Sequence, residues 1–467
     1  MKKIILLIIF CTLMMSVAAC TSESSGTASS PMTSGENTSD STPTTESSSA
    51  PQSTAALPPM ATPDPNKKST LVFAMYAYDP YLEDATKAYE QKHPNIKIDF
   101  QYVAKEFDPA GTLVEKFNTK TNADFLRGKG PDLVVMDDLP ETKYVGNKLL
   151  VNLGEMMDSD PSFQKEQYYQ NIISNIKEKD GGVYTMPLSF YLSGLIGDEE
   201  ALDKSGVAFD DKSWTWDQFS KTMKNLPPTD KYNFPYFAKT EQNLLYEMVN
   251  ANFSQLVDKV NKKAYFDTDR FIKLMEQIKT MEADKTLTLD PKNYEKVYFQ
   301  QGDLYSLSNF LDYLENSKIS KLKLYELPKA EGQQPGGYFS TFLNIGINAN
   351  TSLKPEAWDF LKFLMSGEGS LTDKELEGNL GWYNSLPISK TVFEARAAET
   401  MKDGKLKQED LQQIEAFISN AKTPKTRMPG EIEIIFFKEV PAFFSGQKSA
   451  QVVADTIQNK AMTYLNE

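Results

Sequence analysis

The sequence predicts an α/β protein whose folded part has two domains, and three observations carry that prediction. The chain has 467 residues, 40% of them hydrophobic and 11% aromatic, so it can bury a large core. From residue 69 onward, strand-like and helix-like patterns alternate. A leader and a polar tether come first, and the remaining stretch of about 400 residues is too long for one ordinary domain.

The chain begins with the pattern of a signal peptide. Lys2 and Lys3 precede an apolar run at 4–10, and small residues at 17–19 precede Cys20. The apolar part is shorter than the roughly 20 residues that span a bilayer, although a retained membrane anchor stays open as the alternative. Val-Ala-Ala-Cys at 17–20 resembles the lipobox of bacterial lipoproteins. This resemblance implies that residues 1–19 are removed and that Cys20 carries the lipid.

Cysteine content agrees with this interpretation. The chain has two cysteines: Cys11 would leave with the leader and Cys20 would be lipidated. The folded part would then contain no thiol, which excludes disulfides and cysteine catalysis.

Residues 20–68 form a tether dominated by Ser, Thr, Pro, Gly and Ala. With so few large apolar side chains it cannot offset the entropy of ordering, so we expect it to be disordered. A lipid at one end would let the folded domains stand off the membrane. Whether this Ser/Thr/Pro stretch is glycosylated is left open.

The charge of the chain argues against nucleic acid as a partner. Loss of the leader removes two lysines and no acid, so the formal net charge changes from −14 to −16, and no basic tract stands out. We interpret the acidic balance as a solvated surface.

The first folded elements follow in order. An apolar strand at 71–75 leads to a helix at 81–91, and an alternating strand at 96–103 follows. A second helix at 109–126 leads through two glycines to a buried strand at 131–136. Strand, helix and strand in alternation predict a mainly parallel sheet covered by helices.

Polar and aromatic side chains follow the first and third of these strands. Tyr76 and Tyr78 follow the first, and Asp137 and Asp138 follow the third. The carboxyl ends of strands in such sheets point at the ligand crevice, so these residues are the first site candidates. Helix capping is the alternative role for the acids.

Several short motifs resemble a known family in order from about residue 70 to the end. They are Gly-Pro-Asp-Leu-Val at 130–134, Gly-Asn-Lys-Leu-Leu-Val-Asn-Leu at 146–153, Gly-Val-Tyr-Thr-Met-Pro at 182–187, Trp-Thr-Trp-Asp-Gln-Phe at 214–219, Ala-Trp-Asp-Phe-Leu-Lys-Phe-Leu at 357–364, Leu-Pro-Ile at 386–388 and Phe-Ser-Gly-Gln-Lys-Ser-Ala at 444–450. Together they are similar to the extracellular solute-binding proteins of family 1, the sugar-binding lipoproteins of ABC importers. Departures from the family pattern at 196–200 and 308–310 leave the ligand class open.

The resemblance implies a type II, periplasmic-binding-protein-like clamp of two α/β lobes, each a mainly parallel sheet flanked by helices. The first lobe would comprise residues 69–190 and 345–385, and the second residues 191–344 and 386–467. Hinge crossovers would lie near 187–191, 341–343 and 386–387.

A sugar site needs aromatic faces for the ring and carboxylates or amides for the hydroxyls. Besides the four candidates above, residues of these types in predicted loops are Tyr191, Tyr236, Phe237, Asn309, Tyr338, Trp382, Tyr383 and Asn384. Trp382 stands out because it lies in a loop that starts at a glycine, beside a predicted crossover. Trp358, in an amphipathic helix, and Trp214 and Trp216, at a helix start, are expected to pack in the core.

The residue inventory disfavours an enzyme. The lone histidine, His93, lies in a turn before a proline, and no Ser-His-Asp set, metal site or phosphate-binding loop is present in the sequence. We therefore expect no catalytic residue, no metal and no cofactor. A glycoside hydrolase built on Asp137 and a second carboxylate is the enzymatic alternative.

The functional expectation follows from the resemblance. The chain would capture an extracellular solute, with a mono- or oligosaccharide favoured, by lobe closure and deliver it to an ABC permease. A ligand-sensing lipoprotein that partners a membrane sensor kinase is the alternative. We expect a monomer at the outer face of a Gram-positive cell membrane, since a long tether suits a thick wall, with a periplasmic setting left open.

Overall fold

The computed structural model describes residues 62–105, 111–258, 261–368, 385–425 and 428–466. The predicted signal peptide, Cys20 and most of the tether lie outside the described residues. So do Trp382, Tyr383 and Asn384. The expectations about these residues stay predictions.

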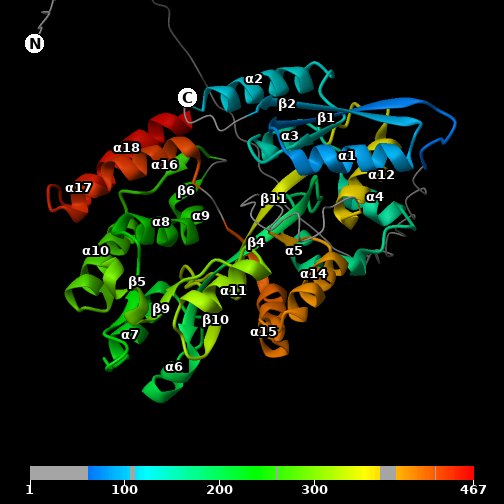
Figure 1. Ribbon diagram of the computed structural model, residues 1–467. Helices are drawn as coiled ribbons and strands as arrows, with labels where there is room; N and C mark the ends of the chain where they lie inside the picture. The colour runs from blue at the N-terminus through cyan, green and yellow to red at the C-terminus, as the bar shows by residue number, and fades with distance from the viewer. Residues whose placement is uncertain (1–61, 106–110, 259–260, 369–384, 426–427, 467) are drawn as a thin grey trace, which may run out of the picture. The chain divides into compact units, whose positions relative to one another are not determined.

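Helices and strands alternate along the described chain (Figure 1). The strands are β1 Ser69–Ala77, β2 Ile96–Ala104, β3 Leu133–Val135, β4 Thr185–Asp198, β5 Phe234–Phe237, β6 Val257–Asp258, β7 Lys263–Ala264, β8 Leu287–Thr288, β9 Val297–Gln301, β10 Leu322–Glu326, β11 Gly337–Ile347, β12 Leu386–Pro387 and β13 Ala421–Pro424. The α-helices are α1 Pro80–Lys92, α2 Thr112–Leu126, α3 Glu141–Gly146, α4 Leu153–Ser159, α5 Gln170–Ile173, α6 Glu199–Ser205, α7 Trp216–Asn225, α8 Glu241–Ala251, α9 Phe253–Leu256, α10 Asp269–Ala283, α11 Leu307–Asn316, α12 Lys354–Ser366, α14 Lys390–Lys402, α15 Gln408–Ser419, α16 Gly430–Glu439, α17 Pro441–Phe444 and α18 Ala450–Asn466. Two 3-10 helices, η1 Lys165–Gln167 and η2 Pro291–Lys296, complete the set.

Most of the described strands join one 11-stranded mixed sheet. Its main path runs β2-β1-β3-β11-β4-β9-β5-β8, while β10 and β12 pair with β4 and β13 pairs with β11. Pairing is parallel toward both ends of this path, in β2-β1-β3 and in β9-β5-β8. It is antiparallel where β11 and β4 lie in the middle. The predicted α/β class is confirmed, and along the main path parallel pairing is found toward the two ends, while β13 adds a parallel strand to β11.

The first elements match their predictions closely. Strand β1, helix α1, strand β2 and helix α2 agree with the predicted ranges within about three residues, the usual uncertainty of a helix or strand boundary. Asp79 explains why α1 begins where it does, since its Oδ1 accepts from the backbone N–H groups of Tyr81 and Leu82. The third strand is shorter than predicted, Leu133–Val135, because the chain turns after Met136.

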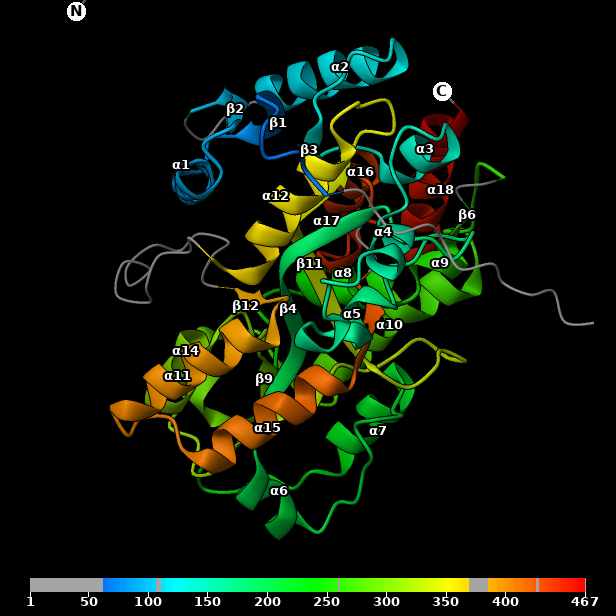
Figure 2. The ribbon, with the colours of Figure 1, turned by 90° about the vertical axis from the view of Figure 1, so that its right-hand side faces the viewer.

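The two long strands β4 and β11 run side by side over most of their length (Figure 2). The three predicted crossover segments meet on them: Phe342 pairs with Ser189, and Leu386 of β12 pairs with Phe190. The three predicted crossover segments are therefore neighbours in the sheet, because β11 and β12 both pair with β4 at residues 189 and 190. The lobe boundaries themselves stay a prediction.

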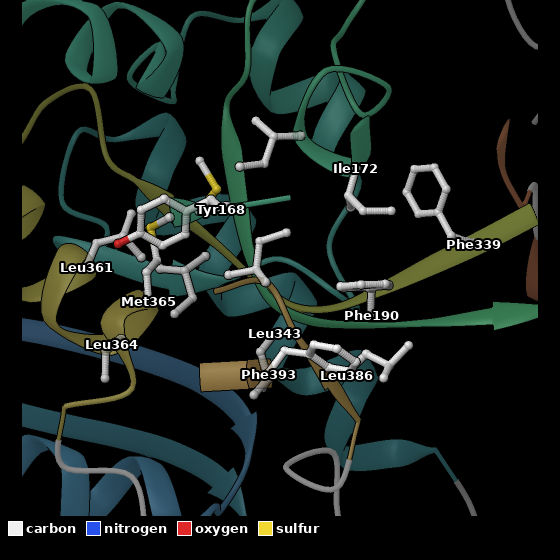
Figure 3. Close-up of a cluster of buried hydrophobic side chains, with 14 of the residues drawn as sticks. Tyr168, Ile172, Phe190, Phe339, Leu343, Leu361, Leu364, Met365, Leu386 and Phe393 are labelled. Atoms are coloured by element: carbon white, nitrogen blue, oxygen red, sulfur yellow. The ribbon is translucent and has the colours of Figure 1, made fainter. Parts of the chain in front are cut away.

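Two large hydrophobic clusters and a smaller one form the core. One large cluster gathers β1, β3, α12 and one side of β4 and β11, and Figure 3 shows part of it around Phe190, Phe339 and Leu343. The other gathers α7, α8, α10, α16 and α18 around β5 and β9. Buried residues between Leu386 and Ala421, which the sequence assigned to the second lobe, pack in the first cluster.

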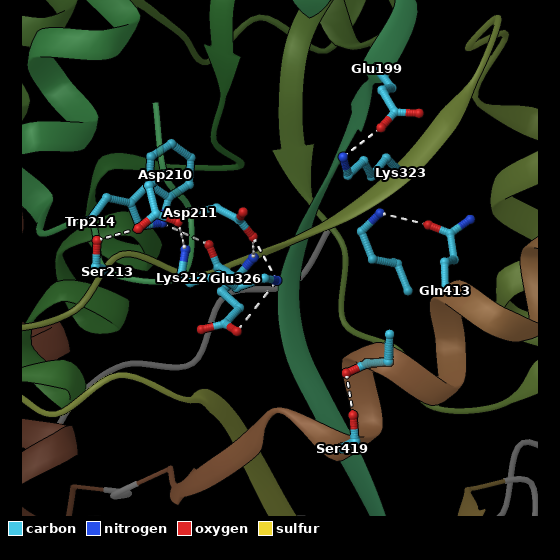
Figure 4. Close-up of polar contacts among 12 residues, drawn as sticks. Glu199, Asp210, Asp211, Lys212, Ser213, Trp214, Lys323, Glu326, Gln413 and Ser419 are labelled. Atoms are coloured by element: carbon cyan, nitrogen blue, oxygen red, sulfur yellow. Dashed lines mark hydrogen bonds and ion pairs between the residues drawn. The ribbon is translucent and has the colours of Figure 1, made fainter. Parts of the chain in front are cut away.

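A buried polar network holds β10 in place (Figure 4). Lys329 and Glu326 are both about 1% exposed, and Lys329 Nζ lies 2.7 Å from Glu326 Oε2. Trp214 Nε1 donates to the Glu326 carbonyl, and Gln413 of α15 accepts from the Leu324 N–H. Because a buried charge is costly unless it is paired, this network fixes how α15 and the turn before α7 meet the sheet.

The tryptophans predicted to pack in the core do so. Trp214, Trp216 and Trp358 are each exposed by 4% or less. Thr215 caps α7 and forms a capping box with Gln218, which explains the motif at 214–219 as a helix start.

Candidate functional site

The pair of strands β4 and β11 has two unlike faces, because side chains alternate along a strand. Phe190 and Leu192 of β4 and Phe339 and Ile345 of β11 enter the first hydrophobic cluster. The residues between them point the other way and form what we call the polar face. Its members are Ser189, Tyr191 and Ser193 of β4 and Tyr338, Ser340, Phe342 and Asn344 of β11.

Three aromatic rings stack on the polar face. The Tyr191 ring lies 5.2 Å from the Phe342 ring, with an angle of 20° between the ring planes, and 4.7 Å from the Tyr305 ring, with an angle of 25°. Tyr305 is 42% exposed, so this aromatic stack ends in a ring that reaches solvent. Flat rings of this kind can pack against the C–H face of a sugar.

The loop after β9 places Tyr305 on this face. Leu304 exchanges backbone hydrogen bonds with Leu192 of β4, at 2.8 and 3.1 Å. Gly302 makes this close approach feasible, because a Cβ there would lie 2.5 Å from Cγ2 of Ile196. Asn309 Oδ1 accepts from the Tyr305 N–H. The exposed ring therefore belongs to a backbone segment that hydrogen bonds hold at Leu304 and at Tyr305 itself.

A charged cluster of Glu247, Asp303 and Lys425 lies beside the stack. Lys425 Nζ is 2.9 Å from Glu247 Oε2 and donates to Ser193 Oγ at 3.2 Å. The Tyr305 hydroxyl donates to Asp303 Oδ2 at 3.4 Å. Asp303 Oδ1 is buried and has no hydrogen-bond partner among the described residues.

Burial controls the protonation of this cluster. It raises the pKa of the Asp303 carboxyl, and the charge of Lys425 only partly offsets that effect. Burial likewise raises the pKa of Glu247. Burial alone would lower the pKa of the Lys425 ammonium, but the charges of Glu247 and Asp303 outweigh it and hold that pKa above its usual range.

Asp137 anchors the far end of the polar face. Its Oδ2 accepts from the Leu343 N–H at 2.8 Å, and its Oδ1 accepts from the backbone and side-chain N–H groups of Asn344 at 2.9 and 2.7 Å. Leu343 has a φ of 51°, which is strained for a branched side chain. The Asp137 carboxylate thus holds the strained backbone of β11 by hydrogen bonds. Desolvation raises the pKa of this carboxyl.

Glu141, in the first turn of α3, lies close to this anchor. It accepts from Thr185 Oγ1 at 2.8 Å, and Thr185 pairs with Gly346 across the same two strands. Burial raises the pKa of Glu141 to about 7, with a further contribution from the charge of Glu178.

The remaining candidates near β1 and β3 lie apart from the aromatic stack. Tyr76 packs on Phe117, with ring centroids 6.4 Å apart. The Tyr78 hydroxyl donates to Glu83 Oε2 at 2.9 Å, and the Tyr78 ring lies against Tyr102. Asp138 is exposed in the turn after β3.

Of three candidates from later in the chain, Tyr236 and Tyr338 lie near the charged cluster, and Asn309 contacts Tyr305. Tyr338 is 5% exposed, and its hydroxyl donates to Gln333 Oε1. Tyr236 is buried against Phe219, and the charges of Glu247 and Asp303 reinforce the effect of burial in raising its pKa. Asn309 acts on Tyr305 through its backbone.

The sequence pointed to Tyr191, but it missed five residues that the structure places beside it: Phe342, Ser193, Asp303, Tyr305 and Lys425. A signal existed for two of them, since Gly302-Asp303-Leu304-Tyr305 is a glycine-started loop with an acid and an aromatic after a strand. Nothing local distinguished Lys425, because its role depends on β13 pairing with β11.

The described ranges contain neither a membrane-spanning helix nor a cluster of metal ligands. None of the helices there combines the length and the apolar character that a bilayer crossing requires. No group of three or more His, Cys, Asp or Glu side chains in this part of the chain is arranged to hold a metal ion.

Comparison with known proteins places this fold among two-lobe binding proteins. A solute-binding protein of family 1 from Alicyclobacillus acidocaldarius matches with a TM-score of 0.61 and 17% identity, covering 86% of this chain and 100% of the other. A sugar transporter from Rhizobium etli in an open conformation matches with a TM-score of 0.56 and 17% identity over 84% and 98%. A periplasmic oligogalacturonide-binding protein from Yersinia enterocolitica gives a TM-score of 0.55 and 17% identity over 85% and 99%.

The family is shown by the sequence itself. The model of the bacterial extracellular solute-binding protein family matches residues 75–370, more than half of the chain. The chain therefore belongs to the bacterial extracellular solute-binding proteins, as the ordered motifs predicted.

Proposed function

We propose that this chain captures an extracellular mono- or oligosaccharide on the polar face of β4 and β11 and delivers it to an ABC permease. The observation that carries the proposal is the exposed Tyr305 ring, stacked on Tyr191 and held beside the charged cluster. An aromatic face next to carboxylates, an ammonium and hydroxyls matches the apolar faces and polar edges of a sugar ring.

Capture would proceed by closure of two lobes about the adjacent crossover segments on β4, β11 and β12. A ligand that contacts both lobes favours the closed form by its extra contacts there. No bond in the solute is broken in this scheme, so the chain acts as a binding protein and not as an enzyme. A cofactor has no part in it.

Sugar binding is tested by a thermal-shift screen of the purified chain against mono- and oligosaccharides. A ligand that binds only the folded state raises the melting temperature, by several degrees at about 100 times its Kd. Tyr305→Ala should abolish that rise, whereas Tyr265→Ala, which alters another exposed tyrosine, should leave it intact. Absence of a shift with every sugar would remove the carbohydrate assignment.

We also propose that a lipid on Cys20 holds the monomeric protein at the outer face of the cell membrane, with residues 21–68 as the tether. The lipobox-like sequence at 17–20 supports this. Cys20→Ser should move the chain from the membrane fraction to the soluble fraction. Retention in the membrane fraction would overturn the anchor.

A further inference from the structure

The polar face carries more negative than positive charge in the part of the chain that the structure describes. Asp137 binds Asn344 at one end, and Glu247 and Asp303 lie at the other. Lys425 is the cation in contact with this face, where it donates to Ser193. Among the described residues, three acidic side chains, whose pKa values burial raises, therefore stand against one ammonium.

Lys425 does not neutralise the cluster, because Glu247 already engages it. The two are 2.9 Å apart, with each side chain about 13% exposed. Asp303 forms no ion pair with a described residue, and its Oδ1 is buried without a hydrogen-bond partner. In a region of low dielectric, such a charge acts on its surroundings more strongly than a solvated one.

The exposed ring reinforces this field. The Tyr305 hydroxyl donates to Asp303, so the carboxylate lies at the hydroxyl edge of the ring that a sugar would stack on, while Tyr191 covers one face of that ring. The π face of an aromatic ring is itself the negative end of a quadrupole, which attracts cations and repels anions. An anionic group beside Tyr305 would meet both effects, and among the described residues the ammonium at this face, Lys425, is already paired with Glu247.

We infer that the ligand is a sugar without a negative charge and that the Tyr305–Asp303 end of the polar face rejects uronic acids and other acidic sugars. This inference rests on the proposed function and adds a substrate class to it. Neutral sugars and amino sugars are accepted, and an ammonium group is favoured by the same field that excludes a carboxylate.

The test uses matched sugars that differ in one group. Binding of the full mature chain is measured by calorimetry for glucose, glucosamine and glucuronate, and for the corresponding galactose and mannose sets. In the set that binds, we expect the acid to bind at least about tenfold more weakly than the neutral sugar, corresponding to about 1.4 kcal/mol. The amino sugar should not show such a loss.

A charge-neutralising variant locates the effect. Asp303→Asn keeps the side-chain volume and an oxygen for the Tyr305 hydroxyl, and it should reduce the ratio of neutral-sugar to acid affinity by about threefold or more. Asp312→Asn, an exposed position on α11, is the matched control and should leave the ratio unchanged.

The outcomes separate the two ideas. An acid that binds within about threefold of the neutral sugar overturns the charge selection while sugar capture stands. A loss for the amino sugar as large as that for the acid overturns it too, because the sign of the charge would then not decide the affinity. If no member of any set binds, and oligosaccharides built from the same units also fail, sugar capture fails and the inference falls with it.

Discussion

One face of the β4–β11 pair is apolar and the other is polar, although alternate residues of the same two strands build both. Phe190 and Leu192 are 0% and 1% exposed in the core, while Tyr191 between them stacks with Tyr305 at the edge of solvent. A one-residue slip in register would exchange the two sets. The comparison teaches that the β4–β11 pair contributes core packing with one face and proposed ligand contacts with the other.

The largest expected effect tests this division directly. Phe190→Ala removes a fully buried ring that packs edge-on against Tyr169, and it should lower the free energy of unfolding by about 3–5 kcal/mol. Tyr191→Ala, one residue along, removes a partly exposed ring and should cost clearly less stability while it abolishes ligand binding. Urea denaturation measures the first quantity and calorimetry the second. Equal destabilisation by the two variants would break the comparison.

The next effect concerns the polar face alone. Lys425→Met would leave Glu247 without its ion-pair partner and Asp303 without a nearby ammonium, and we expect a loss of about 3–5 kcal/mol in the free energy of unfolding at neutral pH. Adding Glu247→Gln to this variant should restore part of the loss, because one stranded charge disappears. A loss below about 1 kcal/mol for Lys425→Met would mean that the pair is solvated as surface pairs are.

Asp137 should contribute less to the free energy of unfolding than the Lys425–Glu247 ion pair does, and more than Asp138 does. Asp137→Asn replaces one of the two acceptor oxygens that hold Leu343 and Asn344 with an amide donor, so at least one hydrogen bond from the carboxylate to the β11 backbone is lost. We expect a destabilisation of about 1–3 kcal/mol by denaturant titration. Asp138→Asn, in the exposed turn that follows, is the matched control and should have a smaller effect. If the two are equal, Asp137 does not anchor β11.

Local patterns predicted the elements and only part of the site. The alternation at 96–103 and the capped helix at 80–92 were readable because neighbours along the chain determine them. Tyr191 was found because it lies in a predicted crossover. Lys425 and Glu247 meet across 178 positions of sequence, and no periodicity records a contact between residues so far apart.

The sheet shows the same limit. The parallel pairs β1–β2 and β1–β3 follow from strand and helix alternation, whereas the antiparallel pairing of β4 with β11 joins strands about 150 residues apart in the chain. Because that pairing creates the polar face, the residues gathered by it could be predicted singly and not as a set.

The smallest expected effect is a pH dependence at the end of the polar face near Asp137. The pKa of Glu141 rises from 4.5 to about 7 on folding, so between these values the folded state binds more protons than the unfolded state. Its contribution therefore favours folding at the acid end of this window, and stability is lost as pH rises through about 7.

Glu141→Gln keeps an oxygen for the Thr185 hydroxyl and removes the buried charge. Relative to the wild type, it should gain about 1–3 kcal/mol on going from pH 5 to pH 8, measured by denaturation at each pH. Glu155→Gln, an exposed glutamate on α4, should show no such gain. If the Glu141→Gln and wild-type curves stay parallel across that range, the Glu141 carboxylate is solvated, and the strand ends near Asp137 carry less buried charge than the cluster around Lys425.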